Sequence, residues 1–269
     1  MKKNLVGVTA ALILSSITPA FAGTITTPPA SVGTATQVTV PSTVLNAQFL
    51  DEMGMSQSLA AYKGKTVLVV PLLTLCGDTC PFTSANMMQI QQKLSEDKAS
   101  NVVVVGVTVD PYRDNSARTT AYLKLIGANF DIWTPVGATS KPSFTKAQLA
   151  AKDPVGSGDI NPNLLAYEKF FGWTAQVVPQ GNPPATDWMT PFKPLTYDIN
   201  HSDGFWIIDP TQKVRFLSGT QPAFTGKLSH VLATFMGSKS NIYKDPVYKG
   251  GWTSAQVLQA LSFVDQVKY

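Results

Sequence analysis

The chain has 269 residues, 44% of them hydrophobic and 14% charged, with a formal net charge of +4. So low a charged fraction, without a dense cluster of Lys and Arg, argues against capture of nucleic acid or another polyanion. A chain of this length can bury a large core, and one large domain is expected.

The N-terminus is predicted to be a secretory signal peptide. Two lysines after Met1 precede the apolar stretch Leu5–Ile17, and the small-residue site Ala20–Ala22 follows it. This is the order of a cleavable export signal, and the apolar stretch is too short for a confident membrane span. We expect residues 1–22 to be removed. The mature protein would begin at Gly23 with a net charge of +2, lie in the periplasm and carry no membrane anchor.

The segment 23–42 is rich in Thr, Ala, Pro and Gly and has no hydrophobic period, which predicts a flexible lead-in. Residues 43–269 are then expected to form the single domain. Thr43–Gly54 predicts a short strand with a turn at Gly54, and Ser58–Lys65 predicts a helical turn that ends at a glycine.

Two apolar, β-branched segments predict buried strands of a parallel or mixed sheet, namely Lys65–Leu73 and Asn101–Val109. Between them, Phe82–Leu94 has helical spacing, and Pro81 suits a first helical turn. Strand, helix and strand in this order predict a right-handed parallel crossover, and therefore an α/β fold.

The second half contains further helices, a hairpin and a long connection. Ser116–Ile126 predicts an amphipathic helix, and Gly204–Pro210 and Lys213–Gly219 predict a hairpin. An extended connection at about 131–200 is expected to hold two short helices and an irregular, functional loop. A helical extension closes the domain. The two short helices are Ser143–Lys152 and Asn163–Gly172, the loop is Gln176–Pro194, and the last helices are Lys227–Met236 and Ser254–Val267.

The only two cysteines, Cys76 and Cys80, lie four residues apart where a buried strand meets a helix. In helical backbone their Cβ atoms would be roughly 5–6 Å apart. This spacing suits one soft metal ion or a disulfide, and a helix N-terminus favours the thiolate. Because so short a loop would gain little stability from a bridge, the pair is expected to serve chemistry. The alternative is two inert, buried thiols that pack as small apolar groups.

Four motifs in a fixed order resemble the Sco/SenC family of thioredoxin-fold copper proteins. The resemblance covers roughly residues 43 to 235. The motifs are Tyr62–Lys65, Cys76–Pro81, Val109–Asp114 and His201-Ser202 followed by Ile208–Pro210.

The resemblance implies a thioredoxin-like central mixed sheet flanked by helices, and copper held by Cys76, Cys80 and His201. It further implies delivery of copper to the copper-site subunit of a cytochrome c oxidase or to another copper acceptor. Thiolates favour Cu(I), and an added imidazole lets the set hold Cu(II) as well. The family usually has an acidic residue before this histidine, but Asn200 stands there. A carboxylate that orients His201 must therefore come from elsewhere. From composition alone, His201 would be a surface histidine at the start of a strand.

A second function remains open, in which Cys76 and Cys80 form a redox-active pair of a thiol-disulfide oxidoreductase. Reductases of the thioredoxin type place a cis-proline opposite the cysteines, whereas Asn200–Gly204 contains no proline. This favours metal over a peptide substrate, and we do not expect a conventional enzyme.

Several other residues are assigned structural roles. His230 is expected to be structural or exposed, and Met87 and Met88 to pack in or near the core. The charges of Asp110 and Arg113 are expected to pair locally, with partner docking as the alternative.

Overall fold

The computed structural model describes residues 25–137, 146, 161–180, 183–190, 192–236 and 251–269. The predicted signal peptide and all of the predicted helix Ser143–Lys152 except Lys146 lie outside these residues. Among the described residues, no helix combines the length and hydropathy that crossing a membrane requires.

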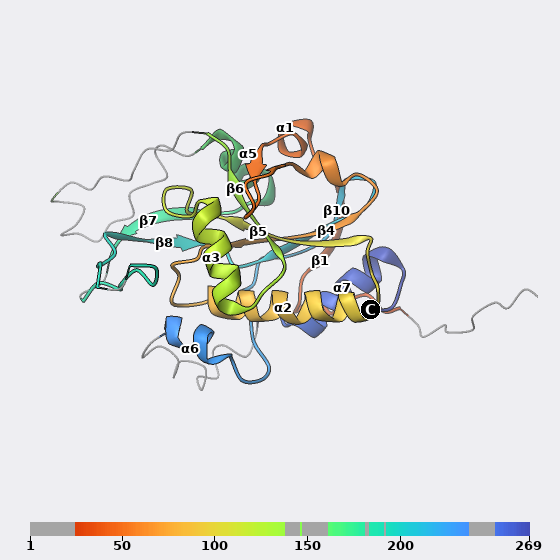
Figure 1. The fold of residues 1–269 in the computed structure, drawn as a ribbon. Coiled ribbons are helices and arrows are strands. Elements are labelled where there is room, and N and C mark those ends of the chain that lie inside the picture. The colour runs from red at the N-terminus through yellow and green to blue at the C-terminus, as the bar shows by residue number, and fades with distance from the viewer. Residues whose placement is uncertain (1–24, 138–145, 147–160, 181–182, 191, 237–250) are drawn as a thin grey trace, which may run out of the picture.

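An eight-stranded mixed sheet forms the centre of the molecule, in the order β1-β10-β9-β4-β5-β6-β2-β3 (Figure 1). Strands β4, β5 and β6 are parallel, and every other pairing in this sheet is antiparallel. The strands are β1 Thr34–Thr39, β2 Phe49–Leu50, β3 Ser56–Gln57, β4 Thr66–Leu72, β5 Val102–Thr108, β6 Asp131–Pro135, β9 Phe205–Ile208 and β10 Lys213–Ser218.

Helices cover both faces of this sheet (Figure 1). Ile90, Leu123 and Leu261 belong to a core on one face, and Leu164 and Phe171 belong to a separate core on the other. A mixed sheet between two helical layers is the predicted thioredoxin-like α/β architecture, which is confirmed. The first face carries α2 Cys80–Glu96, α3 Ser116–Ile126, α6 His230–Met236 and α7 Ser254–Asp265, and the second carries α1 Ser42–Leu45 and α5 Pro162–Phe171. A short 3₁₀ helix, Leu59–Tyr62, precedes β4.

The predicted crossover around the cysteines is present. Every residue of β4 is buried, as a Val-rich central parallel strand requires. Its partner β5 runs in the same direction, with Thr66 opposite Val102 and Leu72 opposite Thr108. Helix α2 connects the two strands and therefore begins at the carboxyl end of β4, the usual position for a site in such a sheet.

Three segments differ from the sequence predictions. Thr34–Thr39 forms edge strand β1 rather than a flexible lead-in, because it pairs through its backbone while its polar side chains remain mostly exposed. Part of the predicted strand at Thr43–Gly54 is helix α1, which starts after Pro41, and only the two residues of β2 are extended. Gly54 does form the predicted turn, with φ +79°.

The predicted irregular loop at Gln176–Pro194 instead begins with strand β7, Ala175–Pro179. This strand pairs with β8, Tyr197–His201, in a second, two-stranded sheet. Val177 and Ile199 lie opposite each other and are buried, so apolar burial holds the pair together. The Pro and Gly residues that suggested a loop lie almost entirely between the two strands.

Candidate metal centre

Cys76, Cys80 and His201 form the one cluster of three potential metal ligands found among the described residues. Cys76 lies in the loop after β4, Cys80 is the first residue of α2, and His201 is the last residue of β8. One ligand atom from each lies within 4.8 Å of the others. His201 Nε2 is 3.3 Å from Cys80 Sγ. The cluster therefore joins two segments that lie far apart in the sequence.

The loop between the cysteines is held close to helix α6. A Cβ atom at residue 77 would lie 2.7 Å from the backbone oxygen of Phe235, so only glycine fits at Gly77 without a shift of the backbone. The amide of Asp78 points back toward Cys76 Sγ at 3.4 Å. A backbone donor at this sulfur favours its thiolate form.

The three ligands differ in their exposure to solvent. Cys80 is 1% exposed, and the side chain of His201 is 4% exposed. Cys76 is only partly buried. As whole residues, Cys76 and His201 are both partly buried, so the cluster is shielded from solvent and Cys80 is its deepest member.

The two thiols have opposite pKa shifts. A hydrogen bond from Cys80 holds the pKa of Cys76 well below its usual value, with His201 adding to the effect against the opposing influence of burial. Burial raises the pKa of Cys80 well above its usual value, and the neighbouring Cys76 thiolate raises it further. Cys76 is thus the more readily ionised of the two thiols, and Cys80 holds its proton more tightly.

The imidazole of His201 faces the sulfurs through Nε2, because Nδ1 hydrogen-bonds to the carbonyl oxygen of Ser202 at 2.7 Å. Burial alone would lower the pKa of His201. Its hydrogen bond to Cys76 and the charges of Asp203 and Cys76 outweigh burial and raise this pKa to about 9. A thiolate and an imidazolium therefore stabilise each other in the metal-free site.

Asp203 provides the carboxylate that Asn200 cannot. Its Oδ1 lies 3.8 Å from His201 Nδ1 and accepts a hydrogen bond from Thr79 at 2.8 Å. Outer-shell carboxylates commonly orient metal-binding histidines. Asp203 was assigned no role from the sequence. The only signal that could have identified it is its position two residues after His201.

The residues that were assigned structural roles lie outside this cluster. His230 is exposed at the start of α6, Met87 is fully buried in the core, and Met88 packs partly buried against it. Arg113 forms the predicted ion pair with Asp110.

Two sulfur donors and one imidazole nitrogen form a set that suits soft or borderline ions. Cys80 lies at a helix start and His201 at the end of a strand that is packed on the core, while Cys76 lies in the loop whose Gly77 is held against α6. The fold therefore largely sets the spacing of the three side chains.

Comparisons with known proteins agree with the motif order. Residues 41–139 match the family model SCO1/SenC. This region includes Cys76, Cys80 and Asp110–Asp114 but not His201, and the match confirms the resemblance inferred from the motifs. No curated protein matches the chain.

Solved structures with similar folds include copper-bound members named ScoI. ScoI of Bradyrhizobium japonicum with copper bound is 18% identical, with 79% of this chain and 99% of that chain covered and a TM-score of 0.45. Copper-bound ScoI of Arabidopsis thaliana is 16% identical, with 74% and 96% covered and a TM-score of 0.44. A cysteine-to-serine mutant of PrxQ from Xylella fastidiosa is 12% identical, with 77% and 96% covered and a TM-score of 0.40.

Proposed function

We propose that this protein is a periplasmic copper metallochaperone of Sco/SenC type. It holds copper through Cys76, Cys80 and His201 and passes it to the copper site of a cytochrome c oxidase. The observation that carries the proposal is the convergence of these three ligand atoms within 4.8 Å of one another. The family match over residues 41–139 and the softness of the two sulfur donors support copper as the ion.

The chemistry of the site suits a carrier. Cys76 already favours the thiolate, and a bound cation would displace the proton of Cys80, because only a thiolate ligates. Two thiolates satisfy Cu(I), and the imidazole of His201 completes a set that also holds Cu(II). Release proceeds by ligand exchange, in which thiolates or imidazoles of the acceptor replace those of this chain one at a time.

A copper titration of reduced protein tests the proposal, with a chelator of known affinity as competitor. We expect one copper per chain. Cys76→Ser should lose affinity for both Cu(I) and Cu(II). His201→Ala should lose affinity mainly for Cu(II), by more than the roughly tenfold loss expected when a hydrogen-bond partner of a ligand is removed. The matched control is His230→Ala, which removes the chain's other, exposed histidine. Failure of the reduced wild type to bind copper would refute the carrier function.

The periplasmic location rests on the predicted signal peptide. Intact-mass measurement of exported protein should give a chain that begins at Gly23. A mature protein that retains Met1 would contradict export by cleavage.

A second function, thiol-disulfide exchange, is supported by the opposite pKa shifts of the two cysteines. The Cys76 thiolate would attack one sulfur of a partner disulfide and release the other as a thiolate. Cys80 would then attack Cys76, so that the partner gains two electrons and this chain keeps a disulfide. Cys80→Ser should trap the mixed disulfide at Cys76, which mass spectrometry would detect. If wild-type protein binds no copper but turns over a protein disulfide, this function replaces the first.

A further inference from the structure

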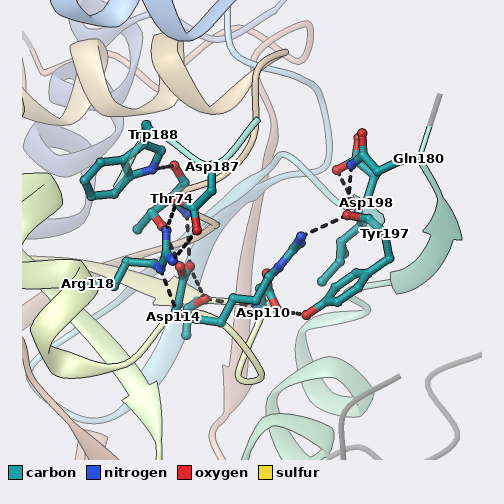
Figure 2. Close-up of polar contacts among 12 residues, drawn as sticks. Thr74, Asp110, Asp114, Arg118, Gln180, Asp187, Trp188, Tyr197 and Asp198 are labelled. Carbon is teal, nitrogen blue, oxygen red and sulfur yellow. Dashed lines mark hydrogen bonds and ion pairs between the residues drawn. The ribbon is translucent and has the colours of Figure 1, made fainter. Parts of the chain in front are cut away.

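A tryptophan far from the cysteines in sequence is hydrogen-bonded to the loop that carries them. Trp188 Nε1 donates to the backbone oxygen of Thr74 at 2.8 Å (Figure 2). Thr74 lies two residues before Cys76. Trp188 itself belongs to the segment 183–190 between β7 and β8, beyond the region that matches the family model.

The same turn is held from its other side by a buried carboxylate. Asp114 accepts hydrogen bonds from both the amide and the hydroxyl of Thr74, the first at 3.0 Å (Figure 2). It accepts a third bond from the hydroxyl of Thr108 at 2.7 Å. Asp114 is fully buried. Asp114 therefore fixes the amide N–H of Thr74, and Trp188 fixes its carbonyl oxygen.

Trp188 is anchored by an ion pair. Arg118 on α3 forms two parallel hydrogen bonds, each 2.8 Å long, with the carboxylate of Asp187. Both side chains are largely buried, at 14% and 11% exposed, so this pair is stronger than a typical surface ion pair. The pair joins the segment 183–190 to α3 directly beside Trp188, as Figure 2 shows.

Ring contacts tie Trp188 to the helix that covers the cysteine loop. Its ring lies 6.0 Å from the ring of Phe235 and 6.0 Å from that of Tyr122. Phe235 is the residue whose backbone oxygen approaches Gly77. Trp188 thus touches the cysteine loop directly through Thr74 and indirectly through α6.

We propose that Trp188 is a positioning residue of the metal centre, which holds the turn at Thr74 and thereby sets the place of Cys76. This inference rests on the proposed function only where its test measures bound copper. The segment 183–190, which supplies none of the three candidate ligands, thereby contacts the loop that carries Cys76.

The test substitution is Trp188→Phe, which removes the indole donor and keeps an aromatic ring for Tyr122 and Phe235. The matched control is Trp173→Phe. The Nε1 of Trp173 is buried and has no hydrogen-bond partner among the described residues, so the control loses similar volume but no hydrogen bond. Both variants should fold, as near-ultraviolet circular dichroism would verify.

Three readouts follow the position of Cys76. In reduced, metal-free protein, iodoacetamide should alkylate Cys76 about fivefold faster in Trp188→Phe, the change that the loss of one hydrogen bond produces. In copper-loaded protein, Trp188→Phe should shift the sulfur-to-Cu(II) charge-transfer band and release copper faster. Trp173→Phe should leave all three values as in wild type.

A double-mutant cycle separates positioning from general destabilisation. Asp187→Asn, which weakens the anchor at Arg118, should accelerate alkylation in the wild-type background but add little to Trp188→Phe. Equal alkylation rates in wild type and Trp188→Phe, or equal effects of the two tryptophan variants, would overturn the proposal. Absence of copper binding in the wild type would instead refute the proposed function, and the alkylation rates would still test the role of Trp188.

Discussion

Asp203 accepts a hydrogen bond from Thr79, the residue immediately before Cys80, while its carboxylate also lies beside His201. One carboxylate therefore connects the two segments that supply the ligands. Asp203→Ala should lower Cu(II) affinity about tenfold, since an outer-shell partner of the histidine is lost. Asp203→Asn should lose less, because its amide oxygen still accepts from Thr79.

Competition titrations on the two Asp203 variants check this expectation. Asp97→Ala is a suitable control, because Asp97 lies at the far end of α2 and pairs only locally with Lys93. Wild-type affinity in Asp203→Ala would mean that the bond from Nδ1 of His201 to Ser202 orients the ring by itself.

Metal-free protein is expected to form a Cys76–Cys80 disulfide in air and to lose copper uptake until it is reduced. Both cysteines are free in the structure, their sulfurs lie within 4.8 Å, and the lowered pKa of Cys76 favours the thiolate that starts the exchange. Thiol trapping followed by mass spectrometry measures the fraction oxidised. Two free thiols after prolonged exposure to air would contradict this prediction.

Asn86 is predicted to be a major contributor to stability. Its buried amide accepts from the backbone amide of Ser254 at 2.7 Å and donates to the oxygen of Ala223 at 2.8 Å. Asn86→Ala would leave both backbone groups unpaired, at a cost of about 2–4 kcal/mol. Urea unfolding gives this value. The exposed Gln89→Ala, which removes a hydrogen bond to the side chain of Ser254, should cost less than about 1 kcal/mol.

The stability of the protein should fall as the pH rises through about 7, in part because of Glu168. This side chain is 8% exposed, its Oε1 has no hydrogen-bond partner among the described residues, and burial raises its pKa from 4.5 to about 7. The folded state therefore holds this proton more tightly than the unfolded chain does. The resulting stabilisation is complete below pH 4.5 and is lost as the pH rises through 7.

Glu168→Gln removes this titration while keeping the size of the side chain. Relative to wild type, the variant should gain stability progressively from about pH 5 to about pH 8, by about 2 kcal/mol after allowance for partial solvent access. Chemical denaturation at several pH values measures the difference. The exposed Glu96→Gln should show no such trend, and a constant difference for Glu168→Gln would contradict the mechanism.

The two cysteines of the cluster and the central crossover were predictable from sequence because each has a local signal. Lys65–Leu73 and Asn101–Val109 are apolar enough to specify buried strands, and Cys76 and Cys80 lie at the junction that follows the first strand. His201 was different. Nothing in its own neighbourhood marked it as a ligand, and only the motif order of the resembling family placed it with the cysteines.

Features that depend on long-range contacts were not predictable in the same way. Strand β1 is held by backbone pairing at a sheet edge, so its side chains carry no hydrophobic pattern. Strand β7 is specified by its pairing with β8, which follows a segment rich in Pro and Gly. Asp203 and Trp188 reach the cysteine loop through hydrogen bonds with Thr79 and Thr74, which lie far from them in the sequence, so no local spacing pattern predicts these contacts.

The three candidate ligands come from two segments of the chain and differ in depth. Cys76 and His201 are both partly buried, whereas Cys80 at the start of α2 is 1% exposed. In the proposed carrier function, an acceptor would therefore replace Cys76 or His201 first. Cys80 would then be the last ligand of this chain to let go of the ion and the first to lose access to solvent on loading.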